Sequence, residues 1–144
     1  MTHSRRKFVM NLLGMWLVGV YAGCTAVGPN EKVRHGLEIE VDKSVGRAVN
    51  IRYTYGDEFV NSTKPSAIAI GPMFTYIAPM RIPEEFEISW ETQDGKQHEA
   101  TVPVRGRLPG SVENKTVLFV IMQDHIEGYV SVSTPYGPKR ERFY

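Results

Sequence analysis

Alternation of apolar and polar residues with a period of two is the feature that most constrains the fold of this chain. The alternation runs through residues 33–41 and 49–55, and again through 86–91 and 98–104. Successive side chains of a β-strand point to opposite faces, so each segment presents one apolar and one polar face. No helical periodicity of useful length follows residue 24. Short strands separated by Gly and Pro turns predict an all-β chain, a single small β-sandwich of antiparallel hairpins.

The first two alternating segments are close together in the chain. Only a short loop around Lys43-Ser44-Val45-Gly46 separates residues 33–41 from residues 49–55. A loop of about four residues is typical of a hairpin, so we expect these two strands to pair with each other.

Two further hairpins have stronger turn signals. Asp94-Gly95 lies between residues 86–91 and 98–104, and this dipeptide favours the positive φ of a tight turn. Pro103 has no N–H to donate, which indicates an edge strand. The last pair is expected from residues 116–123 and 129–134, and its first strand is apolar on both faces, as in a central strand. The short basic tail that follows, residues 139–142, is expected to be solvated.

The segment 65–83 does not follow the alternation. Its first part allows a strand at residues 67–70, but Pro72 and Pro79 interrupt its second half. We expect a loop that crosses the end of the sandwich and fills the core. The alternative is an exposed apolar and aromatic patch that binds another protein, because Met, Phe and Tyr are enriched at interfaces.

The N-terminus has the order of an export signal. Arg5-Arg6-Lys7 precedes an apolar run at residues 8–20, and small residues then lead to Cys24, the one cysteine of the chain. The apolar run is shorter than the roughly twenty residues that span a bilayer.

Tyr21-Ala22-Gly23-Cys24 resembles the lipobox of bacterial lipoproteins, with Tyr21 where an aliphatic residue is usual. The resemblance implies that residues 1–23 are removed, that Cys24 is the lipid attachment site, and that residues 24–32 tether a β-sandwich domain of residues 33–144. An ordinary cleaved signal with an incidental cysteine is the alternative.

The export route has two candidates. Arg5, Arg6 and Phe8 also fit the twin-arginine motif, whereas paired arginines occur in general export signals as well. Both routes lead to the periplasmic side of the cell envelope. Thr25, in place of the Asp that retains many lipoproteins at the inner membrane, implies a lipid-anchored protein of the outer membrane.

Composition limits the partners. Without residues 1–23 the chain has 121 residues, enough for one domain. It then has 14 Lys and Arg against 16 Asp and Glu, a net charge of −2, with both signs interspersed. No basic stripe follows a phosphate backbone, so no nucleic-acid partner is expected.

No catalytic pattern is found. His35, His98 and His125 are too far apart for a helical metal motif, and no serine lies in a Gly-x-Ser-x-Gly setting. The acidic pairs Asp57-Glu58 and Glu84-Glu85 are expected to be solvated loop charges. We therefore predict no enzyme activity, no metal, no cofactor and no small-molecule substrate.

The C-terminal half carries a family resemblance. Its motifs are the strand ending in Ser89-Trp90, the Gly95-Lys96 turn, Val102-Pro103-Val104, Leu108-Pro109-Gly110, Lys115-Thr116-Val117 and Asp124-His125. This pattern resembles small bacterial lipoproteins that act as immunity proteins against phospholipase effectors of the type VI secretion system. The resemblance implies a membrane-anchored protein that binds and neutralises a secreted lipase or phospholipase toxin.

No toxin-binding residue is implied by that resemblance, but the chain itself offers candidates. Met73, Phe74 and Tyr76 are candidates for the apolar centre of a binding surface, and Asp57 and Glu58 for its charged rim. The alternative function is that of a structural lipoprotein in an envelope-spanning assembly or secretion apparatus.

Overall fold

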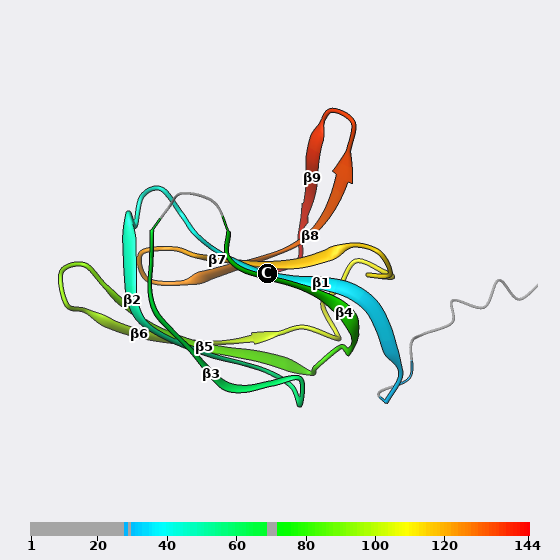
Figure 1. Ribbon diagram of the computed structural model, residues 1–144, viewed down its shortest axis with the longest axis horizontal. Helices are drawn as coiled ribbons and strands as arrows, with labels where there is room; N and C mark the ends of the chain where they lie inside the picture. The colour runs from blue at the N-terminus through cyan, green and yellow to red at the C-terminus, as the bar shows by residue number, and fades with distance from the viewer. Residues whose placement is uncertain (1–27, 29, 69–71) are drawn as a thin grey trace, which may run out of the picture.

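The fold is seen in a computed structural model that describes residues 28, 30–68 and 72–144 (Figure 1). The described residues form nine β-strands and no helix. The strands are β1 (Lys32–Val41), β2 (Arg47–Tyr55), β3 (Phe59–Ile68), β4 (Pro72–Arg81), β5 (Glu85–Thr92), β6 (Gln97–Pro103), β7 (Thr116–Ile121), β8 (Ile126–Thr134) and β9 (Gly137–Arg142).

The strands form two sheets that face each other. Sheet A has the order β4-β1-β7-β8-β9, and sheet B has the order β3-β2-β5-β6. Figure 1 shows the two sheets as layers, with the β8–β9 hairpin rising from sheet A on the side away from sheet B. The predicted all-β fold, a small β-sandwich, is confirmed.

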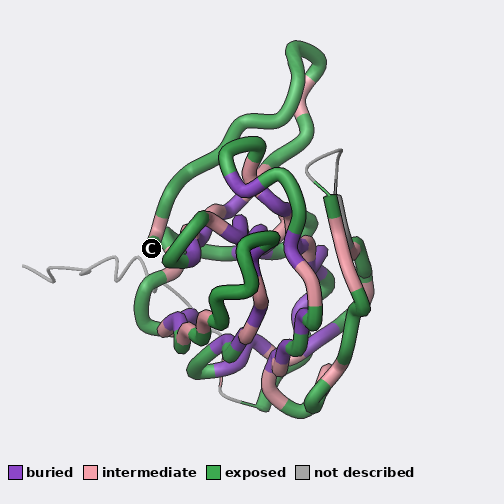
Figure 2. The backbone as a smooth tube through the Cα atoms, turned by 90° about the vertical axis from the view of Figure 1, so that its left-hand side faces the viewer, coloured by how far each residue is buried: buried purple, intermediate pink, exposed green. Residues whose placement is uncertain are grey.

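The core lies between the sheets, where the apolar faces of the alternating strands meet (Figure 2). Leu37 and Ile39 of β1 and Ile51 of β2 are fully buried. Phe86 of sheet B stacks on Phe119 of sheet A, with ring centroids 3.8 Å apart. The alternation that predicted the strands therefore also marks the residues that hold the sheets together.

One polar pair lies inside this core. His35 on β1 is fully buried, its Nε2 lies 2.9 Å from the Tyr55 hydroxyl of β2, and its Nδ1 lies 2.8 Å from the Val33 carbonyl. Burial lowers the pKa of His35, because removal from water disfavours the charged imidazolium. The pair is a hydrogen-bonded link between the two sheets.

Two predicted hairpins are confirmed. β5 pairs with β6 across the Asp94-Gly95 turn, where Gly95 has φ +82°. β7 pairs with β8 and is the middle strand of sheet A. β6 is an edge strand, as Pro103 indicated.

The predicted pairing of residues 33–41 with 49–55 is wrong. β1 pairs with β4 and β7, whereas β2 pairs with β3 and β5 in the other sheet. The link at residues 42–46 crosses from sheet A to sheet B, with Val45 buried and Gly46 at φ +72°. Placement in opposite sheets lets the apolar faces of β1 and β2 pack against each other across the core.

The predicted loop within residues 65–83 is also wrong. The chain forms β3 up to Ile68 and begins β4 at Pro72. β3 and β4 are edge strands of different sheets, and an edge strand tolerates proline because one of its sides has no ladder to complete.

The basic C-terminal tail is exposed, as predicted, but it also forms a strand that was not predicted. Residues 137–142 form β9, which extends sheet A beside β8. Arg140 reaches Glu40 of β1 at 2.8 Å, although β7 and β8 lie between these strands in the sheet. Leu118 and Val120 of β7, which point away from the core residues Val117, Phe119 and Ile121, are also buried.

β1 and β7 run parallel, a pairing that the sequence did not indicate. Gly36 lies beside Thr116 at this pairing, and a Cβ at position 36 would come within 2.7 Å of the Thr116 hydroxyl. The close approach of the two strands requires glycine there.

The predicted export signal, with Arg5, Arg6, Phe8 and Cys24, lies outside the described residues. Within the described part of the chain, no helix is long and apolar enough to cross a membrane.

Candidate functional site

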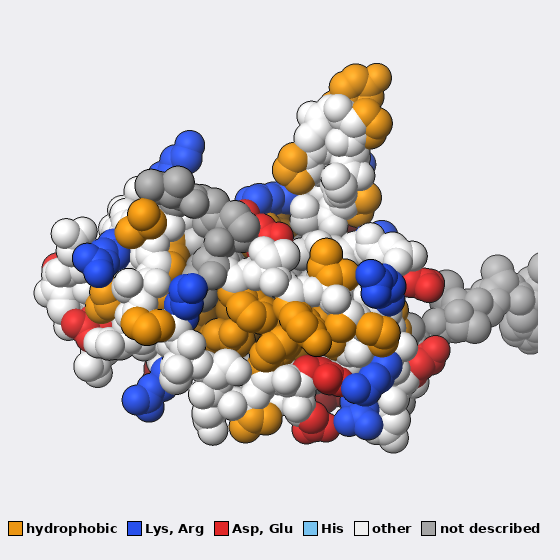
Figure 3. Space-filling view, in the orientation of Figure 1, with side chains coloured by type: hydrophobic (Ala, Val, Ile, Leu, Met, Phe, Trp, Pro, Cys, Tyr) orange, Lys and Arg blue, Asp and Glu red, His pale blue; other side chains and the backbone are white. Residues whose placement is uncertain are grey.

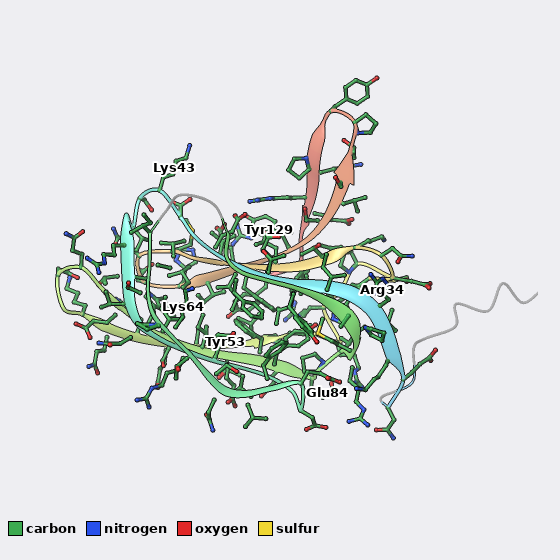
Figure 4. All side chains as sticks on the ribbon, in the orientation of Figure 1. Arg34, Lys43, Tyr53, Lys64, Glu84 and Tyr129 are labelled. Atoms are coloured by element: carbon green, nitrogen blue, oxygen red, sulfur yellow. The ribbon has the colours of Figure 1, made fainter. Side chains whose placement is uncertain are left out.

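Four aromatic side chains gather where β3 and β4, the edge strands of the two sheets, face each other. We call this group the aromatic edge: Tyr53 of β2, Phe59 of β3, and Phe74 and Tyr76 of β4. Figure 3 shows apolar atoms exposed along this side of the molecule, between β4 and β3. Tyr53 points into the space between the sheets (Figure 4) and is 6% exposed.

The rings of the aromatic edge contact one another closely. The Phe59 ring lies edge-on to those of Phe74 and Tyr76, with both centroid separations 5.2 Å. Phe74 is half-buried and packs against the core, whereas Tyr76 is 45% exposed. The predicted pair Phe74 and Tyr76 therefore has two roles: Phe74 closes the core, and Tyr76 lies on the same face at its margin, partly open to solvent.

Asp57 and Glu58, the predicted charged rim, lie in the turn between β2 and β3 next to the aromatic edge. Glu58 forms an ion pair with Lys32, with its Oε1 3.1 Å from Nζ, and accepts a hydrogen bond from the Arg81 amide. Burial raises the pKa of Glu58, but these two donors outweigh it and hold the pKa below its usual value. Asp57 pairs with Arg81 at 3.1 Å and is largely exposed.

These ion pairs change the interpretation of the acidic pair. Glu58 holds the turn to the start of β1 and the end of β4 and is mostly covered, whereas Asp57 also pairs with Arg81 but is largely exposed. The turn leads directly into Phe59, so the acidic residues lie beside the aromatic edge, and their role in binding stays a prediction. The side chain of Met73 lies outside those that the structure describes.

The chain has four histidines, and the three that the structure describes lie apart. His35 is in the core, His98 stacks on Trp90 at 5.1 Å, and His125 is exposed with its Nδ1 2.8 Å from Asp124. Among residues 28, 30–68 and 72–144, no group of three or more His, Cys, Asp and Glu side chains is placed to hold a metal ion.

A second surface was not predicted from the sequence. The outer part of the β8–β9 hairpin, residues 131–140, projects from the sandwich, and we call it the finger (Figure 1). Tyr136 at its tip is 100% exposed, between Pro135 and Pro138 in sequence. Figure 3 shows apolar atoms at the tip, and Lys139 follows directly.

The tip of the finger is held by its own hydrogen bonds. The Thr134 hydroxyl donates to the Gly137 carbonyl at 2.5 Å and accepts from the Tyr136 amide at 3.3 Å. Gly137 has φ +108°, a conformation that other residues rarely adopt. Proline on either side of Tyr136–Gly137 restricts the backbone further, so the tip is a rigid turn.

The base of the finger is fixed to sheet A. Arg140 contacts Glu40 at 2.8 Å and Arg142 contacts Glu127 at 3.0 Å. Phe143 packs on Gly128 so closely that a Cβ there would lie 2.7 Å from the ring. The finger therefore presents Tyr136 from a fixed position. The Pro-Tyr-Gly-Pro sequence at 135–138 is the signal that a reading of the sequence could have used, because it places an aromatic residue inside a turn.

Comparison with known proteins does not assign this chain to a family. No protein-family model and no curated protein matches this chain. A solved structure, an NMR structure of a protein from Eubacterium rectale, is similar with a TM-score of 0.41 and 13% sequence identity, over 70% of this chain and 89% of that one.

Proposed function

We propose that this protein is a membrane-anchored periplasmic immunity lipoprotein that binds and neutralises a lipase or phospholipase effector of the type VI secretion system. The class of partner comes from the resemblance of the C-terminal half to immunity lipoproteins that act against phospholipase effectors. The finger is the observation that carries the proposal, because a rigid, fully exposed aromatic arm is suited to binding and has no role in the core.

The shape and chemistry of the finger fit such a partner. An enzyme that hydrolyses lipids must accept acyl chains, so its substrate site is a concave apolar groove. The finger is convex, and its tip consists of Tyr136 between prolines. Insertion of this tip would exclude substrate without any chemistry by the inhibitor.

Rigidity favours tight binding. A backbone that is already held in its bound conformation loses little conformational entropy on association. Tyr is also among the residues that most often dominate an interface. The lipid anchor predicted at Cys24 would hold the inhibitor near the membrane, where it raises the local concentration at the toxin's site of attack.

Protection of living cells tests the function. Deletion of the gene is expected to make cells sensitive to intoxication by sister cells, and the full-length wild-type chain is expected to restore protection. Loss of secretion with no change in self-killing would refute immunity and support the structural role in an envelope assembly.

The binding residue is tested in the same assay. Tyr136→Ala is expected to lose protection, because loss of an interface hot spot costs about 2 kcal/mol or more, roughly thirty-fold in Kd. Tyr144→Ala is the matched control, since Tyr144 is also exposed (41%) but lies away from the finger. If the Tyr76→Ala chain loses protection and the Tyr136→Ala chain keeps it, the aromatic edge is the toxin-binding surface instead.

A further inference from the structure

The sandwich has four edge strands, and three of them carry the features that prevent edge-to-edge pairing. β9 has Lys139, Arg140 and Arg142, β3 has Lys64 followed by Pro65, and β6 has Glu99 and ends at Pro103. Charged residues and proline on an edge oppose the addition of another strand, because a paired charge is desolvated and proline cannot donate to the ladder.

β4 is different. No Asp, Glu, Lys or Arg occurs from residue 65 to residue 80, so β4 is uncharged until Arg81 at its end. Its prolines, Pro72 and Pro79, lie near its two ends. Between them, the backbone groups that do not bond to β1 are available on the open side of the strand. Tyr76 (45% exposed) and Ile77 (57% exposed) stand on this edge. An uncharged, partly apolar edge strand of this kind is suited to pairing with another strand.

We propose that the partner strand is β4 of a second copy of this chain, paired antiparallel about a two-fold axis at Thr75. Directly opposed residues of antiparallel strands have side chains on the same face, so only residues of like parity can oppose each other. With Thr75 opposite Thr75 of the second copy, Phe74 lies opposite Tyr76 and Tyr76 opposite Phe74.

This register matches side chains of like chemistry. Even-numbered residues of β4 face the core side, as buried Met80 and half-buried Phe74 show, so the Phe74–Tyr76 pairs would join the aromatic edges of the two copies. Thr75 opposes Thr75 on the outer face, and both aromatic pairs and Thr–Thr pairs stabilise antiparallel strands. The register with Tyr76 on the axis is poorer, because it places Phe74 opposite Ala78 and Thr75 opposite Ile77.

The strand order leaves the finger free. β4 and β9 lie at opposite edges of sheet A, so pairing through β4 makes one continuous sheet across two copies with a finger at each end. A symmetric contact of this kind closes on itself and stops at two copies. The inference is independent of the proposed function, because it assigns the aromatic edge to a second copy and needs no toxin.

Crosslinking of the full chain in cells tests the register. Thr75→Cys, treated with a short thiol-to-thiol crosslinker, is expected to give a covalent dimer as the main product. The wild-type chain controls for crosslinks through Cys24. Thr101→Cys, at an exposed position of edge strand β6, controls for random collision, and Ile77→Cys controls for the register. Each is expected to give at most a tenth of the dimer given by Thr75→Cys.

Copurification is a second test of the dimer. Two differently tagged full-length chains, expressed together, are expected to copurify, and Thr75→Arg in both is expected to reduce this at least tenfold, because two like charges then meet at the axis. Thr101→Arg is the matched control and is expected to copurify as the wild type does.

Several results would overturn the inference. It is wrong if the wild-type chains do not copurify, if the Thr75→Arg chains copurify like the wild type, or if Thr75→Cys crosslinks no better than Thr101→Cys. The Thr75→Cys crosslink does not depend on whether the Thr75→Arg chain folds, so it tests the inference even if the Thr75→Arg chain fails to fold.

Discussion

The buried histidine makes the stability of the fold depend on pH. His35 is fully enclosed and its pKa is lowered by burial, so the folded chain holds it neutral at pH values where the unfolded chain, near the ordinary value of 6.5, is already protonated. The unfolded state therefore binds more protons, and stability is lost as pH falls below 6.5. The loss approaches about 1.36 kcal/mol per pH unit, which sets a ceiling of about 2 kcal/mol at pH 5.

Urea unfolding at pH 7.5 and pH 5 measures this effect, with His35→Gln as the comparison. Both chains share every other titrating group, so the difference between their pH dependences isolates His35. We expect the wild type to lose more stability than the variant, by up to about 2 kcal/mol. Equal losses in the two chains would show that His35 is protonated within the fold and would refute the argument.

Tyr55→Phe separates burial from hydrogen bonding at the same site. Removal of the hydroxyl breaks the 2.9 Å contact to His35 and is expected to cost about 1 kcal/mol at pH 7.5. The extra loss at pH 5 is expected to remain, because burial is the main cause of the lowered pKa of His35. If the loss disappears with the hydroxyl, the hydrogen bond rather than burial keeps His35 neutral.

Two further predictions concern sheet A. Burial, together with a hydrogen bond and charge from Glu40, raises the pKa of Glu38 to about 7, so its contribution to stability is full below the unfolded value near 4.5 and is lost as pH rises through 7. Glu38→Gln should lose less stability than the wild type between pH 5.5 and 8.5 in urea unfolding, and an equal loss would contradict this assignment. In thermal unfolding, Phe74→Ala should lower the free energy of unfolding by about 2 kcal/mol and Tyr76→Ala by about 1 kcal/mol. The difference is expected because Phe74 packs on the core, whereas Tyr76 is 45% exposed. The reverse order would mean that Tyr76 is the residue that closes the core.

The residues of the candidate surfaces were predicted unequally. Phe74, Tyr76, Asp57 and Glu58 were identified from their types and spacing, and the fold does bring them to one edge. Tyr53 and Phe59 were not identified, because each belongs to a strand whose contact with β4 is made only across the two sheets. The finger was missed because the basic residues after Tyr136 suggested a solvated tail. Arg140 in fact pairs with Glu40, far away in the chain, and Arg142 pairs with Glu127 of the neighbouring strand.

By itself, the sequence determined the strands with clear alternation, the turn at Asp94-Gly95, the central strand that begins at residue 116 and the edge marked by Pro103. These depend on the period of side chains along one strand and on local backbone preferences, both of which are written in neighbouring residues. Only the tertiary structure decided that β1 and β2 lie in opposite sheets, that β1 runs parallel to β7, and that β4 is an open edge. Partners of a strand are chosen by packing of whole apolar faces over long separations in the chain, which no local pattern contains.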